Sequence, residues 1–254
     1  MSKLHELIGD IIPPANSTMV EIAGSQGAPA VEGHKANVDN RHFLDVQKWL
    51  PLAAEKYEIS SSIKDYVVVP VIILPTDIPN RNSVAFPYEE LMKFNVSQGR
   101  PNFKTWTGKP TFMEHANSNY TKAKGIVFDT YMRPLEHAHG NLYKLIALCG
   151  FDRSKDRELA SGILKGDRKS YSMGAFISQY ECSVCGQTSK PGKMNTECGH
   201  VIRGQPEIYQ DAQGHNIPSY LIARKEITGF EVSSVGVPAW SSATNSQLFD
   251  MNKY

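Results

Sequence analysis

Apolar and polar residues alternate along several stretches of the chain, which is the pattern of strands with one buried face. The clearest case is residues 170–178. Four apolar residues occupy every second position there: Tyr171, Met173, Ala175 and Ile177. Because successive strand side chains point to opposite faces, these four are predicted to lie in a core, with Ser172 and Gly174 on the other face. An exposed strand face would explain those small residues without any chemistry.

The same approach predicts the other helices and strands. Four more strands are predicted, at 65–74, 125–131, 141–149 and 226–237. Residues 43–57 have helical periodicity that we expect Pro51 to interrupt, since proline removes a hydrogen bond from a helix interior. A helix is predicted at 155–165, with Ser154 as its N-cap and Gly166 just past its end. The sum is an α+β fold, a mainly antiparallel β-sheet or β-barrel core with a few flanking helices.

The chain divides into a core and two polar ends. The stretch AGSQGAPAVEG shows no periodicity, so residues 1–60 are predicted to be an N-terminal arm. Residues 61–241 hold most of the predicted elements, and residues 242–254 form a polar C-terminal tail. A chain of 254 residues can bury a substantial core, as one domain with appendages or as two small domains.

Charge and hydropathy narrow the class of partner. The chain has 27 Lys and Arg residues against 26 Asp and Glu residues, so no global field attracts nucleic acid or an anionic membrane. The longest apolar run, Val67 to Leu74, is broken by Pro70 and is too short to span a bilayer. The N-terminus, MSKLHELIGDII, lacks the layout of a signal peptide. We therefore expect a protein of the reducing cytoplasm with no membrane partner.

A group of cysteine and histidine residues has the spacing of a metal site. The ligand types follow the pattern C-x2-C-x12-C-x-H: Cys182, Cys185, Cys198 and His200. Four thiolate and imidazole ligands suit tetrahedral zinc and leave no position for water, so the predicted zinc is structural. His215 is a spare fourth ligand, and a coincidental group of free thiols is the alternative. Cys149 is interpreted as a small core residue.

Two further residues are candidates for chemistry. His115 lies in a polar loop before a predicted strand, where it is either a solvated side chain or a general base. Glu231 shares a predicted strand face with Gly229 and Ser233. It is either exposed on an edge strand or buried with a partner such as an imidazole. A nucleophilic Ser172 would need both of these residues.

In their order along the chain, these pieces resemble the prohead (capsid maturation) proteases of tailed bacteriophages, which are similar in fold to the herpesvirus assembly proteases. The resemblance covers residues 65–241. The matching segments are IPNRNSVAFPYEEL, the EHAN around His115, AKGIVFDTYM, the segment Ser172 to Phe176, and Glu231 to Ala239. Each motif is short, and their order and spacing carry the resemblance. The metal motif at 182–200 departs from the common members and is interpreted as a small zinc-ribbon-like insertion.

The resemblance implies a role for each candidate. Ser172 would be the nucleophile, His115 the general base, and Glu231 the residue that orients the imidazole. The backbone N–H of Met173 would help to bind the oxyanion, and Arg168 would add positive charge there. Small residues on the Ser172 face would leave room for a substrate peptide. The herpesvirus enzymes use a second histidine in place of Glu231.

Two histidines, His137 and His139, precede Ser172 in the chain, and that order fits the herpesvirus arrangement poorly.

The resemblance also implies partners and a location. The substrates would be the scaffold protein, the major capsid protein and the chain itself, inside the assembling prohead in the host cytoplasm. The arm at 1–60 would then be a propeptide, because exposed flexible segments suit self-cleavage. A homo-oligomer is compatible with this role. The rival hypothesis is a non-catalytic zinc-ribbon protein that binds a virion lattice or nucleic acid, although residues 182–200 hold only two lysines, no arginine and no aromatic residue.

Overall fold

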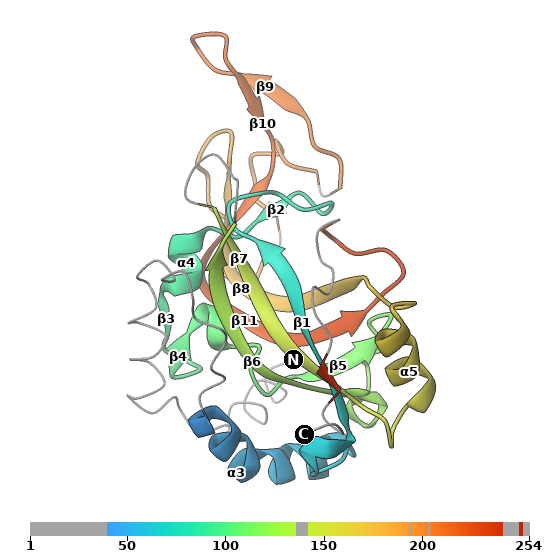
Figure 1. Cartoon of the computed structure of the whole chain (residues 1–254). Helices are drawn as coiled ribbons and strands as arrows, with labels where there is room; N and C mark the ends of the chain where they lie inside the picture. Colours follow the sequence, from blue (N-terminus) through green and yellow to red (C-terminus); the bar gives the residue numbers. More distant parts are fainter. Residues whose placement is uncertain (1–39, 136–141, 194, 203, 241–248, 251–254) are drawn as a thin grey trace.

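The computed structural model describes residues 40–135, 142–193, 195–202, 204–240 and 249–250 (Figure 1). Its main feature is a curled sheet of eight strands that forms half a barrel (Figure 1). The strands are β1 (Tyr66–Pro75), β2 (Val84–Ala85), β5 (Pro110–Met113), β6 (Gly125–Pro134), β7 (Tyr143–Asp152), β8 (Tyr171–Cys182), β11 (Leu221–Ser234) and β12 (Phe249–Asp250). The predicted α+β class is confirmed.

The strands follow the order β12-β1-β7-β6-β5-β11-β2, and β8 pairs with the free side of β11. The pairs β1–β7, β6–β7, β5–β6 and β8–β11 are antiparallel, whereas β11 runs parallel to β5 and to β2. Two small sheets pair separately from the main one: β3 (Phe94–Asn95) with β4 (Arg100–Pro101), and β9 (Ile208–Gln210) with β10 (Asn216–Pro218). The five strands predicted from alternation are all present, with ends that differ by a few residues.

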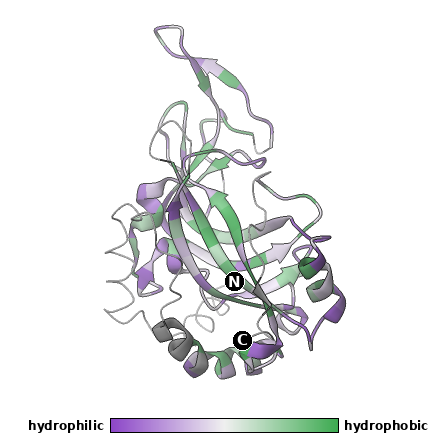
Figure 2. Ribbon diagram, viewed as in Figure 1, coloured by the Kyte–Doolittle hydropathy of each residue, from purple (hydrophilic) through white to green (hydrophobic). Residues whose placement is uncertain are grey.

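Strand β1 is buried on both faces. Val67, Val69 and Val71 belong to the larger apolar cluster, which packs inside the curl of the sheet against β7, β8 and β11. Tyr66 and Val68 belong to a second cluster, which lies between the sheet and helix α3 (Asn40–Tyr57). Burial on both faces explains why this strand reads as a continuous apolar run rather than an alternating one (Figure 2).

The helices of the described residues differ in two details from the prediction. Pro51 does not interrupt α3, which runs to Tyr57 with Pro51 exposed on its surface. In α5 (Arg157–Lys165) the N-cap is Asp156 rather than Ser154, since the Asp156 carboxylate accepts from Leu159 N–H. Gly166 ends α5 with φ +79°, as expected for a left-handed cap.

The remaining elements are short. They are α4 (Tyr88–Met92) and three 3₁₀ turns at Ile63–Asp65, Asn102–Lys104 and Tyr120–Lys122. Helix α3 falls within the predicted N-terminal arm, and its side chains pack on the sheet from Val46 onward. The rest of that arm, residues 1–39, and most of the predicted tail lie outside the described residues, as do His137 and His139.

Candidate active site and metal centre

Three strands bring the candidate catalytic residues to one region of the sheet. β11 lies between β8 and β5. Ser233 marks where they meet, because its Cα partners are Ser172 in β8 and Phe112 in β5. His115 follows the end of β5 by two residues, and Glu231 lies two residues before Ser233. Positions distant in sequence are therefore gathered around one stretch of β11.

Glu231 is the centre of the polar contacts in this region. Its side chain is fully buried, and its Oε1 lies 2.8 Å from His115 Nδ1. Its Oε2 accepts a short hydrogen bond from the Ser233 hydroxyl. A buried carboxylate needs such partners, since an unpaired charge is costly in a protein interior. Of the two interpretations open from the sequence, the exposed edge position is wrong and the buried pair with an imidazole is confirmed.

The loop that carries His115 has an unusual backbone. Glu114 and His115 adopt consecutive left-handed φ angles of +49° and +55°, which residues other than glycine rarely take. Such strain costs roughly 1–3 kcal/mol per residue and persists only where the surroundings fix it. Here Glu114 N–H donates to the Ser234 carbonyl at 2.9 Å, and Asn117 N–H donates to the His115 carbonyl at 2.7 Å. These contacts hold the imidazole beside β11.

The pKa of His115 is raised above its ordinary value of 6.5. The largest cause is the hydrogen bond to Glu231; burial of the ring opposes it, and the negative charges of Glu231 and Glu114 add to the rise. A carboxylate on Nδ1 also selects the neutral tautomer that carries its proton there. The other ring nitrogen, Nε2, is then a proton acceptor on a side chain that is 44% exposed.

We expect the contact between His115 and Glu231 to stabilise the fold more at low pH than at high pH. Because the folded-state pKa lies above the unfolded value of 6.5, the contribution is complete below that value and is lost as pH rises through the raised pKa. Chemical denaturation of the native protein and of His115→Gln, at about pH 5.5 and about pH 8.5, measures the effect. The difference in free energy of unfolding between the two proteins should be larger at the lower pH, and equal differences would contradict the raised pKa.

Ser172 lies on the same face of the sheet as Glu231 and Ser233. Directly opposed residues in an antiparallel pair place their side chains on one face, about 4.5–5.5 Å apart at Cβ, and Ser172 is opposed to Ser233. Its side chain is nearly buried, with 6% exposed. Within the described residues no hydrogen bond joins the Ser172 hydroxyl to His115. The structure thus joins base and carboxylate directly, and places the serine on the adjoining strand without a hydrogen bond to the base.

A β-bulge makes this face less open than the sequence suggests. The pairing of β11 with β8 shifts between Gly229 and Glu231, so that Phe230 is the extra residue. Its ring fills the space beside Gly174, where an added Cβ would lie 2.3 Å from it. On the core side an added Cβ at Gly229 would lie 2.2 Å from the ring of Trp106. The expectation that small residues leave this face bare is wrong at Gly174, which instead accommodates an aromatic ring.

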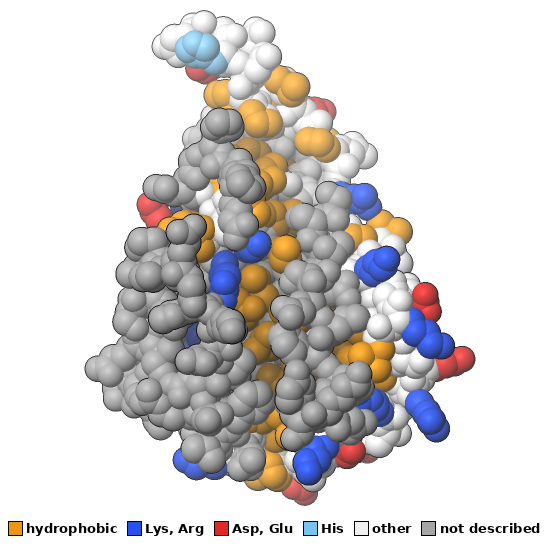
Figure 3. Space-filling model, viewed as in Figure 1, with side chains coloured by type: hydrophobic (Ala, Val, Ile, Leu, Met, Phe, Trp, Pro, Cys, Tyr) orange, Lys and Arg blue, Asp and Glu red, His pale blue; other side chains and the backbone are white. Residues whose placement is uncertain are grey.

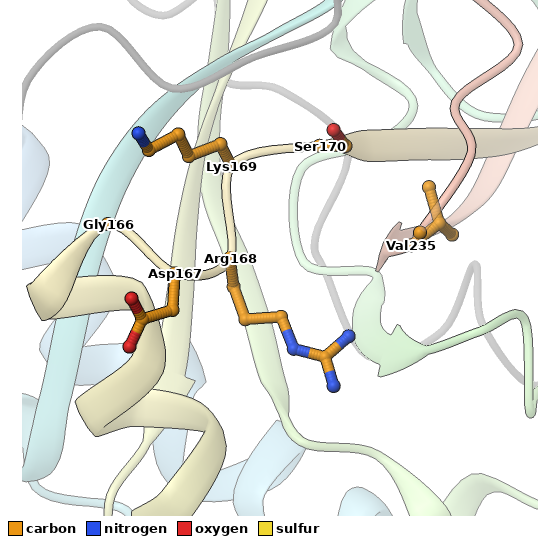
Figure 4. Close-up of a pocket in the computed structure, with 7 residues that line it drawn as sticks. Gly166, Asp167, Arg168, Lys169, Ser170 and Val235 are labelled. Carbon is orange, nitrogen blue, oxygen red and sulfur yellow. The ribbon is translucent and has the colours of Figure 1, made fainter.

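The two residues expected to bind an oxyanion are differently placed. Met173 follows Ser172 and packs its side chain against the core, opposite Val232. Arg168 lies before β8, with Nη1 3.5 Å from Glu114 Oε1. It lines a pocket of about 350 Å³ together with Gly166, Asp167, Lys169, Ser170, Val235 and Gly236, and its guanidinium points away from Lys169 (Figure 4). The positive charge of Arg168 is thus shared with a carboxylate.

The predicted metal ligands meet at the far end of the β8–β11 pair. The thiol and imidazole groups of four residues lie within 4.8 Å of one another: Cys182, Cys185, Cys198 and His200. Residues 183–220 leave the sheet between β8 and β11 and end in the protruding β9–β10 hairpin (Figure 1), a longer excursion than the 182–200 predicted. The cluster is compatible with a metal site.

Local backbone geometry supports metal binding at these sulfurs. The N–H groups of Val184 and Cys185 donate to Cys182 Sγ, and the N–H of His200 donates to Cys198 Sγ. Burial raises the pKa of Cys182. At Cys198 burial is outweighed by hydrogen bonds from Thr196 and from His200 N–H, and the pKa is lowered. Donated hydrogen bonds stabilise thiolates, which are the form that binds a metal.

His215 is not part of the cluster. Its ring is 77% exposed and Nδ1 lies 3.0 Å from Asp211 Oδ2, in the hairpin loop. The spare-ligand assignment is therefore wrong, and His200 is the fourth member. Cys149 is fully buried in the core, and burial raises its pKa, as expected for a packing residue.

None of the helices in the described residues is both long and apolar enough to cross a membrane.

Comparison with known proteins gives no family for this chain. No family model matches the sequence, and searches of curated proteins and of solved structures find no match either.

Proposed function

We propose that the protein is a serine endopeptidase of the prohead protease type, with Ser172 as nucleophile, His115 as base and Glu231 as the orienting carboxylate. The observation that carries the proposal is the fully buried Glu231 bonded to the half-exposed imidazole of His115, on the sheet face that Ser172 shares. A carboxylate, an imidazole and a hydroxyl in that order are the components of a catalytic triad.

In this proposal Ser172 bonds to the substrate, His115 transfers the protons and Glu231 orients His115. Glu231 holds the Nδ1 proton of His115, so that Nε2 takes the proton of the Ser172 hydroxyl as its oxygen bonds to the scissile carbonyl carbon. The imidazolium then gives that proton to the leaving amine as the peptide bond breaks. Water, deprotonated by the same nitrogen, hydrolyses the acyl ester. Ser233 keeps the second oxygen of Glu231 occupied, which fixes the carboxylate throughout.

A hydrogen bond between Ser172 and His115 has to form before this reaction. Hydrogen bonds between nucleophile and base are often long in the absence of substrate and tighten when it binds. The loop of His115 is held to β11 by the Glu114 backbone, and Ser172 lies on a paired strand, so rotation of the Ser172 and His115 side chains is expected to form this bond. The N–H of Met173 is the proposed oxyanion donor. Arg168 has a lesser role, because Glu114 shares its charge.

The resemblance also supplies the biological setting of the proposal. The substrates are the scaffold protein, the major capsid protein and the chain itself, cleaved in an assembling prohead in the host cytoplasm, with a homo-oligomer compatible with that setting. The half-barrel is proposed to be the protease β-barrel. Structural zinc is the proposed metal at Cys182, Cys185, Cys198 and His200, since three thiolates and an imidazole suit tetrahedral zinc and close the site to water.

Active-site labelling tests the proposal. A fluorophosphonate is expected to modify Ser172 of the native protein co-expressed with capsid and scaffold proteins, because only an activated hydroxyl reacts readily. His115→Ala should abolish the labelling. Peptide mapping by mass spectrometry locates the modified residue, and Ser170→Ala is the matched control, since Ser170 precedes the nucleophile by two positions. Labelling that persists in Ser172→Ala, or that never depends on His115, would refute the triad.

A second function, binding without catalysis, is favoured by one observation. The excursion that carries the metal ligands exposes apolar side chains, with Ile208 70% and Ile202 50% exposed, and apolar side chains gather on the surface at the base of its hairpin (Figure 3). Such residues suit contact with another protein. Unlabelled Ser172 combined with retained binding to capsid protein, lost on Ile208→Asp, would favour this function over proteolysis.

A further inference from the structure

We propose that Glu114 is a positioning residue that fixes the imidazole of His115 by tying three separate segments together, a role that rests on the proposed protease function. The triad geometry does not single out Glu114, although it belongs to the EHAN segment of the sequence. It is a half-exposed glutamate in a polar loop, which by itself suggests a solvated side chain.

The contacts of Glu114 reach all the segments around the site. Its backbone N–H donates to the Ser234 carbonyl at the end of β11. Its side-chain Oε1 accepts from Gly236 N–H at 3.0 Å and lies 3.5 Å from Arg168 Nη1, in the segment before β8. Glu114 therefore joins the loop after β5 to β11, which carries Glu231, and to the segment that precedes β8, which carries Ser172.

The same contacts shape the pocket between the end of α5 and the segment after β11. Arg168, Ser170 and Val235 line it, and Val235 N–H donates to the Ser170 carbonyl at 3.0 Å (Figure 4). Ser170 is two residues before the nucleophile. The contacts of the Glu114 side chain with Arg168 and Gly236, called the clamp below, thus hold one wall of this pocket as well as the loop that carries His115.

The glutamate at this strained position contributes to the orientation of His115 rather than to the stability of the fold. An ion pair in which Glu114 is 55% and Arg168 41% exposed contributes little to stability, because solvent screens it. A left-handed φ of +49° would favour glycine or asparagine, so the side chain is retained at a cost. What the carboxylate supplies is a fixed direction for the next residue, His115, and a negative charge near its ring.

The test uses Glu114→Gln, which keeps an oxygen for Gly236 N–H and loses the charge. The matched control is Glu58→Gln, because Glu58 is also left-handed, at φ +53°, is 61% exposed and lies 3.6 Å from Lys155. Glu114→Gln should lower the rate of fluorophosphonate labelling about tenfold, since a small misplacement of reacting groups has large effects on rate. Its melting temperature should equal that of Glu58→Gln.

A second measurement does not depend on catalysis. The charged groups that act on the ring of His115 are Glu231 from β11 and Glu114 from its own loop. Arg168 forms an ion pair with Glu114 and so neutralises part of that charge. Removing the charge of Glu114 should lower the pKa of His115, measured by NMR titration, and Glu58→Gln should not. The double variant Glu114→Gln with Arg168→Gln should be labelled no more slowly than the slower of the two single variants. Both substitutions remove the same ion pair, that between Glu114 and Arg168.

The outcomes separate this proposal from the one it rests on. If the native protein is never labelled while Glu114→Gln alone shifts the pKa of His115, the protease function fails and the clamp stands. If Ser172 is labelled but Glu114→Gln changes neither the labelling rate by more than about twofold nor the pKa of His115, the clamp is overturned.

Discussion

Replacing Glu231 by glutamine is expected to lower the rate of peptide cleavage about 10⁴-fold while leaving the fold intact. Glutamine has the same shape, so the contacts to Ser233 and to the strand can persist. Its amide group, however, can donate to His115 Nδ1, which selects the tautomer that has a proton on Nε2 and no lone pair there. The base is then lost although every residue remains in place.

The measurement is single-turnover cleavage of a co-expressed capsid protein substrate, with the melting temperature followed in parallel. Glu181→Gln is the control, since Glu181 is a glutamate of β8 that pairs with Arg224 at 2.8 Å, away from His115. A fall of tenfold or less for Glu231→Gln, from a folded protein, would mean that the buried carboxylate is structural.

Loss of the proposed zinc ion is the second large effect that we expect. A structural zinc contributes about 10–16 kcal/mol to folding in small zinc-binding peptides. Among the described residues of 183–220, the named strands are β9 and β10, each of three residues, and an isolated hairpin of this kind is marginally stable at best. Chelation, or Cys198→Ser, should therefore unfold the excursion while the β8–β11 pairing and the larger core remain.

Limited trypsin digestion reports this local unfolding. Cleavage after Lys190 and Lys193 should become fast on chelation, and metal analysis should give one zinc per native chain and none for Cys198→Ser. His215→Ala is the matched control, because His215 belongs to the excursion and lies outside the cluster. Unchanged resistance to trypsin after complete metal removal would show that the excursion folds without it.

The strands and the metal cluster could be predicted from the sequence because local signals encode them. Alternation placed Tyr171 and its apolar neighbours on one face, and the core contains them. The spacing of cysteine and histidine identified four side chains whose candidate ligand atoms the fold brings within 4.8 Å of one another. In each case the information lies within about twenty residues, where strand period or knuckle spacing determines the outcome.

The predictions that were wrong concern positions whose packing partners are distant in the sequence. Nothing near Gly174 reveals that Phe230 fills the space beside it, because the bulge is a property of the pairing between two strands. Likewise, Pro51 can stay within α3 because the helix packs on the sheet through its opposite side. Tertiary packing overrides local preference at such positions. Burial alone allowed Glu231 an imidazole partner, and the resemblance was needed to identify that partner as His115, since 116 residues separate the two.

The bulge at Phe230 has a consequence for how much length change the chain tolerates. Because the bulge already absorbs one extra residue of β11, a further residue added between Glu231 and Ser233 would put those two side chains on opposite faces of the sheet, since side chains alternate residue by residue. The excursion at 183–220 has no such constraint outside its metal ligands, and long surface insertions there are thermodynamically mild. Divergent descendants of this chain should therefore vary freely in the length of the excursion while β11 keeps its residue count.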